Sequence, residues 1–221
     1  MTGTGAKENP YIVMDGADFN ALRSISTSTT NITHVELGAD IILDAYDNFT
    51  PIPQCYMNID GKNFSISEYK INSTTEAALF VQLHTQYVKD LVLEGEVTST
   101  STNTSGTGGL LAARIIGRNA EISNVKGFGN VRGRIVGGLI GHVNDEEYNV
   151  STPQTAGTTN IRKCSFKGKV TCAPTGSVST SIGSTMCRIG GLFATIQNQN
   201  GSNRANFTLS ECLAIATLDN S

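Results

Sequence analysis

The chain of 221 residues contains no tryptophan, and aromatic residues make up only 6% of it. A core with so few large rings must be built from Val, Ile, Leu, Ala and Cys side chains. Glycine, by contrast, is abundant at 23 residues. This composition favours flat, regular layers over a core organised around aromatic clusters.

Charge is also scarce, because only 16% of the residues are charged and the formal net charge is −3. Neutralising nucleic-acid phosphates or holding an anionic membrane needs a basic surface, so we expect neither partner. No apolar run approaches the length of a membrane span, and the first residues lack the basic and apolar regions of a signal peptide. We expect a soluble chain that either lost a signal or reaches an exposed place by another route, as a virion component does.

The cysteines form no CxxC pair, which argues against a zinc ribbon. Their odd number argues against a closed disulfide framework. We therefore interpret them as small buried hydrophobic side chains. They are Cys55, Cys164, Cys172, Cys187 and Cys212.

An internal repeat is the strongest signal in the sequence. Four ten-residue segments, called decamers below, align without a gap: 88–97, 122–131, 161–170 and 209–218. Their first and tenth positions are aliphatic, and their eighth position is Gly95, Gly129, Gly168 or Ala216. From the fourth position on, apolar and polar residues alternate as in a strand with one buried face. The alternation breaks only between positions one and four, which predicts a corner or bulge there.

A second piece precedes each decamer and consists of two small residues followed by two large apolar ones. Its copies are 77–80, 108–111, 137–140 and 190–193. Two short strands cannot bury their apolar face alone, so the copies must stack, as in a solenoid. The irregular growth between copies predicts polar surface loops at 98–107, 144–159 and 173–185, the first of them flexible.

Stacking places like positions above one another, about 4.8 Å apart. Cys164 should then lie directly below Cys212 in the core. Glycine at the eighth position should allow a tight turn, or the approach of a neighbouring strand where a Cβ atom would clash.

Several segments resemble the GLUG-repeat family of bacterial surface and secreted proteins. The resemblance rests on Val136–Gly141, echoed by Ile189–Phe193, and on an opening formed by residues 5–13, 18–22, 35–43 and 59–66. The first copy departs from the pattern with Ala77-Ala78 in place of Gly-Gly. The resemblance implies an all-β right-handed parallel β-helix exposed outside the cell, often in adhesin-like proteins, with no general catalytic residues to transfer.

The two ends of such a solenoid need covering. Residues 1–30 are expected to form an N-terminal strand and a capping helix, with Asp15 as N-cap of a helix over residues 17–25. On this helix Phe19, Leu22 and Ile25 share one face, which could cover the first coil. Residues 31–221 should form one continuous β-helix.

The C-terminal coil carries no obvious cap. Leu213 and Ile215 occupy outward positions where earlier decamers carry Lys or Ser, and Leu218 ends the last decamer. Because exposed apolar strand edges are normally avoided, we expect this end to meet a partner chain or further residues.

Catalytic chemistry finds little support. The histidines at 34, 84 and 142 lie in different repeat contexts and are interpreted as surface or corner residues. The third-position ladder contains no adjacent pair of acids, and the acidic run 145–147 is interpreted as a solvated loop tip. That ladder consists of Asp90, Asn124, Lys163 and Glu211. We therefore predict no catalytic, cofactor-binding or metal-binding residues.

The sequence thus predicts a non-enzymatic, exposed structural or binding module. It would serve an adhesin-like bacterial surface protein or a virion fibre or spike, contact a host receptor or glycan, and could assemble as a homotrimer. Two alternatives stay open. A glycan-processing β-helix enzyme would need two carboxylates meeting in a groove on one sheet, and a purely architectural spacer would bind nothing specifically.

Overall fold

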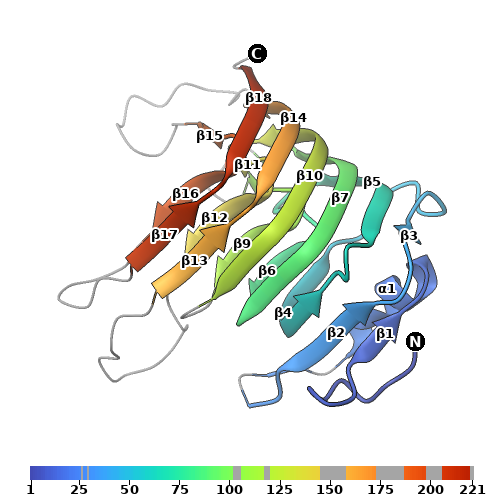
Figure 1. The fold of residues 1–221 in the computed structure, drawn as a ribbon. Coiled ribbons are helices and arrows are strands. Elements are labelled where there is room, and N and C mark those ends of the chain that lie inside the picture. Colours follow the sequence, from blue (N-terminus) through green and yellow to red (C-terminus); the bar gives the residue numbers. More distant parts are fainter. Residues whose placement is uncertain are drawn as a thin grey trace.

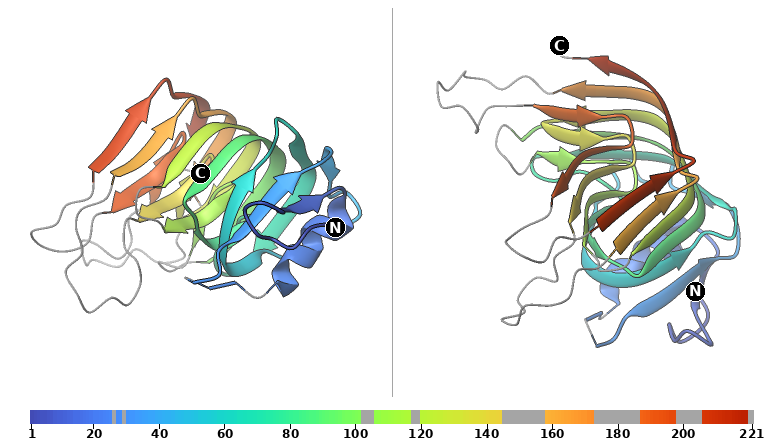
Figure 2. Two further views of the ribbon diagram at one scale, coloured as in Figure 1. Left: turned by 60° about the horizontal axis from the view of Figure 1, so that its bottom comes forward. Right: turned by 60° about the vertical axis from the view of Figure 1, so that its left-hand side comes forward.

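The computed structural model describes residues 1–25, 27–28, 30–101, 106–116, 120–144, 158–172, 187–197 and 206–219. Its strands run parallel to their neighbours, and it contains one short α-helix near the N-terminus (Figure 1). The sheet curls around a common interior, as Figure 2 shows, which gives the chain a solenoid-like form. This confirms the mainly β, parallel architecture expected from the repeat.

The strands fall into four ladders. Ladder 1 contains the start of β4 (Ile52–Asp60), then β6 (Phe80–His84), β9 (Ala112–Ile116), β12 (Ile140–Asn144) and β16 (Phe193–Gln197). Ladder 2 contains β1 (Tyr11–Val13), β2 (Thr33–Leu37), the end of β4, the starts of β7 (Tyr87–Ser99) and β10 (Glu121–Gly133), β13 (Thr158–Arg162) and β17 (Asn206–Ser210).

Ladder 3 contains β3 (Ile41–Ile42), β5 (Ser65–Ser73), the remainders of β7 and β10, β14 (Ser165–Cys172) and β18 (Leu213–Asp219). Ladder 4 contains β8 (Thr107–Gly108), β11 (Ile135–Gly137) and β15 (Arg188–Gly190). From β6 onward the chain visits ladders 1, 2, 3 and 4 in that order and then returns to ladder 1, so each coil lies on the one before it.

The decamers form ladders 2 and 3 in the predicted register. Ile122 pairs with Val88 on one side and with Ile161 on the other, and Ile161 pairs in turn with Leu209. The tenth positions pair in the same way, as Val131 with Val170 shows. Cys164 lies opposite Cys212 in this register and is 1% exposed. The gap-free alignment therefore describes neighbouring strands correctly.

The predicted corner lies at the third decamer position. All four residues there adopt the left-handed backbone region, with φ between 52° and 53°. This turn separates ladder 2 from ladder 3 and explains why the alternation breaks. The Asn124 side-chain amide also donates to Asp90 Oδ1 over 2.8 Å, which joins two neighbouring corners.

Lys163 occupies this left-handed region without the freedom of glycine, at a cost of about 1 kcal/mol for an ordinary residue. Lys163→Gly should therefore be neutral or raise the free energy of unfolding by up to about 1 kcal/mol. Lys167→Gly, in β14, is the matched control and should lower it by about 0.5–1 kcal/mol. Urea titration measures both. An equal loss in the two variants would show that the corner carries no strain.

The eighth-position glycines permit close approach, as predicted. A Cβ atom on Gly168 would lie 1.8 Å from the Gly129 carbonyl oxygen, and one on Gly129 would lie 1.9 Å from that of Gly95. In the preceding coil this position is Tyr69, whose ring fills the space beside Gly95. The fully buried Tyr69 hydroxyl donates to the Leu110 carbonyl over 3.2 Å, and its burial raises the pKa of the phenol well above the ordinary value.

The second piece of the repeat has a different register from the predicted one. Gly137 pairs with Gly190 as aligned, but Gly108 pairs with Val136. The second copy is thus offset by one residue. Small-small-large-large patterns tolerate this offset because both glycines of a pair leave room for the neighbouring backbone.

The N-terminal segment packs against the first coils, close to the expectation. Helix α1 (Gly16–Ala21) begins at the N-cap Asp15, which accepts a hydrogen bond from the Asp18 amide, and a 3₁₀ turn (Leu22–Ser24) follows it. The helix is therefore shorter than the expected 17–25. Phe19 and Leu22 are buried, and the Phe19 ring contacts those of Phe49 and Phe80. Ile25 is partly buried against the same core.

The prediction of a loop over residues 98–107 is partly wrong. Thr98 and Ser99 continue β7, Ser99 is fully buried and donates to the Thr75 carbonyl, and Thr107 begins β8. Residues 102–105 lie outside the described part. For the expected loop 144–159, residue 144 ends β12 and residues 158–159 belong to β13, whereas residues 145–157 and the whole of 173–185 lie outside the described residues.

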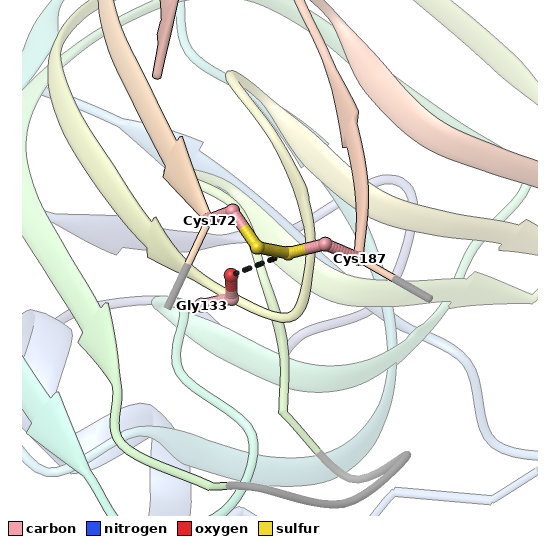
Figure 3. The surroundings of a disulfide bond; sticks show 3 residues. All are labelled: Gly133, Cys172 and Cys187. Atoms are coloured by element: carbon pink, nitrogen blue, oxygen red, sulfur yellow. Dashed lines mark hydrogen bonds between the residues drawn. A yellow bond between two sulfur atoms is a disulfide. The ribbon is translucent and has the colours of Figure 1, made fainter. Parts of the chain in front are cut away.

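The interpretation of the cysteines is also partly wrong. Cys55 and Cys164 are buried, and burial raises the pKa of each thiol to about 12, as suits an inert core side chain. Cys172 and Cys187, however, form a disulfide that links the last residue of β14 to the residue just before β15, with 6.1 Å between their Cα atoms (Figure 3). The Cys187 sulfur lies 3.8 Å from the Gly133 carbonyl oxygen of the preceding coil. The odd number of cysteines argued against a complete set of disulfides but did not exclude this single one.

Candidate functional site

A groove of about 450 Å³ lies on the outer side of ladder 3, between the turn after β3 and strands β5, β7 and β10. Its walls include the aromatic rings of Tyr46 and Phe128 and one cation, Lys70. The lining also includes five carboxylates: Asp44, Asp47, Glu68, Glu94 and Glu96. The groove is therefore strongly acidic.

These five carboxylates take part in no ion pair within the described part of the chain, and Lys70 takes part in none either. The outer side of ladder 2 differs sharply. There Asp60 lies 2.9 Å from Lys89 and 3.2 Å from Lys62. Burial raises the pKa of Asp60, but hydrogen bonds from the two lysines outweigh it, so the pKa lies below its ordinary value. Ladder 2 thus balances its charges internally, whereas the groove does not.

Beyond the groove, the outer side of ladder 3 changes sign from coil to coil. We call the outward residues at decamer positions seven and nine the charged face. Position seven runs Glu94, Phe128, Lys167, Ile215, and position nine runs Glu96, Asn130, Lys169, Thr217. The face therefore passes from acidic on β7, through uncharged residues on β10, to basic on β14 and finally to an apolar residue on β18.

Two large apolar side chains are exposed on the charged face. Phe128 is 40% exposed and Ile215 is 57% exposed. Of the two lysines, Lys169 lies 2.8 Å from Asp219, and Lys167 has no ion pair among the described residues. Such a combination of unbalanced charge and exposed apolar surface is typical of an interaction surface.

The C-terminal coil has an unpaired outer edge among the described strands. Among the described strands β18 pairs only with β14, and it stands with β17 at one end of the stack in Figure 1. Leu213 is 57% exposed, Leu218 53% and Leu209 50%. That this end meets a partner chain or further residues stays a prediction.

The histidines lie on strands, so their interpretation as surface or corner residues is only partly correct. His34 Nδ1 lies 3.1 Å from the Tyr87 hydroxyl on ladder 2. His84 is 7% exposed and stacks on Tyr56 with 4.2 Å between ring centroids. His142 lies two strands from His84 on ladder 1, with β9 between them.

His142 combines an unpaired ring nitrogen with a strongly lowered pKa. Its Nε2 atom and the Oγ1 atom of Thr195, its register partner, are buried without a hydrogen-bond partner. Burial, together with the charges of Arg114 and Arg188, lowers the pKa of His142 to about 4. The imidazole is therefore neutral near pH 7, and no carboxylate orients it in the described region.

The other candidates from the sequence do not converge. The third-position residues form the corner ladder, and the acidic run 145–147 lies outside the described residues. Within the described part of the chain, no group of three or more His, Cys, Asp or Glu side chains could hold a metal ion. The groove was missed because Asp44 and Asp47 lie in a turn and Glu68 precedes the first decamer. Of the acidic residues that line the groove, only Glu94 and Glu96 occupy outward decamer positions, where the sequence could have indicated them.

Comparisons with known proteins show likeness at the level of the fold. No family model and no curated protein matches the chain. A solved structure from Bacteroides ovatus, described as a candidate immunoglobulin A1 protease, is similar with a TM-score of 0.58 and 15% sequence identity. The similarity covers 99% of this chain and 70% of that one. No helix in the described regions is long and apolar enough to cross a membrane.

Proposed function

We propose that the chain is a right-handed parallel β-helix of the GLUG type that serves as a non-enzymatic, exposed structural and binding module. The observation that carries this proposal is the charged face with its groove, a surface of exposed apolar groups and of charges that, apart from the Lys169–Asp219 pair, have no ion pair among the described residues. The charges of ladder 2 are balanced within the chain, so the imbalance on ladder 3 is a local property. The in-register coils supply the rigid scaffold for this surface.

The disulfide supports an exposed setting for the module. Disulfides persist in oxidising compartments and outside cells, whereas cytosolic proteins of most organisms keep their thiols reduced. The Cys172–Cys187 bond also ties the ends of segment 173–186 together. We propose that the module belongs to a bacterial cell-surface protein or a virion fibre or spike, where it contacts a host receptor or glycan.

Binding and cleavage assays on one set of ligands test this function. The labelled chain is applied to a glycan panel, mucin-coated surfaces and host cells, and the same glycans are assayed for new reducing ends. Immunoglobulin A1 is included as a substrate, with its heavy-chain fragments followed by gel electrophoresis, because the structural neighbour is described as a candidate protease of it. Binding of a ligand without its cleavage supports the binding module, and cleavage of a ligand contradicts it. If the chain neither binds nor cleaves any ligand, the result favours the architectural spacer.

The second candidate is a glycan-processing enzyme, which the carboxylates of the groove favour. Glycoside hydrolysis uses two carboxyl groups, about 5–9.5 Å apart, on either side of the bond that is cleaved. Glu68 and Glu94 lie on neighbouring strands and line the groove together. If reducing ends appear, Glu68→Gln and Glu94→Gln should each abolish them, and Glu8→Gln, outside the groove, should not.

A further inference from the structure

We propose that the charged face docks onto the charged face of a second copy, forming a two-fold symmetric dimer. This inference rests on the proposed function, because it names the partner of the docking surface described there. Along the stacking axis, the charge of the face changes sign from one side of β10 to the other. Position seven runs from Glu94 on β7 through Phe128 on β10 to Lys167 on β14, and position nine repeats the order with Glu96, Asn130 and Lys169.

A two-fold axis that runs along β10, in the plane between the two copies, makes this pattern self-complementary. Rotation about it places β7 of one copy over β14 of the other and keeps each position along the strands. Glu94 then faces Lys167 and Glu96 faces Lys169, and symmetry makes each pair occur twice. Sheets packed face to face lie about 10 Å apart, a gap that glutamate and lysine side chains can span together.

The other two-fold arrangement of the same faces is disfavoured. An axis along the stacking direction would place β7 over β7, so that Glu94 and Glu96 would meet glutamates. Like charges in an interface repel and suppress that orientation. The sign change from β7 to β14 therefore selects one orientation of the second copy.

The exposed apolar groups fit the selected orientation. Phe128 lies at the centre, where it meets its own copy, and aromatic residues are enriched at the centres of interfaces. Ile215, on β18, lies over β5 and the groove of the second copy. Lys126 and Arg132, the cations of β10, also meet their own copies, but they lie diagonal to Glu94 and Glu96, which offset them.

Two double charge reversals test the dimer in the intact chain. Light scattering over a concentration series at low ionic strength should give twice the chain mass for the wild type. Glu94→Lys/Glu96→Lys and Lys167→Glu/Lys169→Glu should each weaken self-association at least about thirtyfold, because every facing pair becomes repulsive. An equimolar mixture of the two variants should regain the dimer mass, since all four pairs are then opposite in charge.

Matched variants separate the face from overall charge. Glu8→Lys/Glu121→Lys and Lys7→Glu/Arg162→Glu change the net charge equally at sites outside the charged face and should remain dimeric. A monomeric wild type, equal dissociation of these controls, or a mixture that stays monomeric would each overturn the dimer. If the wild type is monomeric but binds a ligand, the dimer is wrong and the proposed function still holds. If the wild type is dimeric but binds no ligand, the dimer holds and the architectural spacer replaces the proposed function.

Discussion

Gly129→Ala should lower the free energy of unfolding by about 3 kcal/mol or more, the largest effect expected for a single methyl group in this chain. Two causes act together. Gly129 has φ of 140°, which side-chain-bearing residues rarely adopt, and a Cβ atom there would lie 1.9 Å from the Gly95 carbonyl oxygen. Neither the strand nor its neighbour can move away, because β7 and β10 pair on both sides of Gly129, from Leu91 to Thr98 and from Val125 to Arg132.

Ala216 provides the matched control, since it occupies the same ladder position in the last coil. Ala216→Gly should change the free energy of unfolding by less than about 1 kcal/mol. Urea denaturation followed by circular dichroism measures both variants. A Gly129→Ala protein as stable as the wild type would mean that β7 and β10 do not approach as closely as the structure places them.

Acidification should destabilise the protein through His142. Its folded-state pKa of about 4 lies below the unfolded value near 6.5, so the folded state favours the neutral imidazole. The resulting stability is fully present above pH 6.5 and is lost as the pH falls towards 4. Allowing for the partial exposure of this side chain, about 2 kcal/mol should disappear between pH 7 and pH 4.5.

His142→Leu isolates this contribution from that of the carboxylates. The variant has no titrating group at this site and no unpaired Nε2 atom, so its loss of stability on acidification should be about 2 kcal/mol smaller than that of the wild type. Urea titrations of both proteins at the two pH values provide the comparison. The same loss in both proteins would contradict a buried neutral imidazole.

The repeat made ladders 2 and 3 predictable because stacking imposes the same demand on each of the four coils that contain a decamer. Position eight needs a small residue in each of the four decamers, and position three forms the corner in each of them. Both positions can therefore be recognised when the decamers are aligned. The left-handed backbone at position three was not predictable from residue type. Asp90 and Asn124 are of types enriched there, whereas Lys163 and Glu211 are not.

Features that occur once were not predictable in the same way. The Cys172–Cys187 bond joins residues 15 positions apart that belong to no shared column. The groove combines a turn, a pre-repeat strand and two decamers, and only the fold brings these together. The one-residue offset at Gly108 arises because two adjacent glycines offer two equivalent registers.

Cysteine cross-linking measures the register of β10 and β14, on which both the stacked coils and the charged face depend. In a Cys212→Ala background, Lys126→Cys is combined in turn with Ser165→Cys, Lys163→Cys and Lys167→Cys. Ser165 is the register partner of Lys126, so the 126–165 pair should form a disulfide fastest and to the greatest extent under mild oxidation. Faster cross-linking of 126 with 163 or 167 would contradict the stacking of the decamers and the faces built upon it.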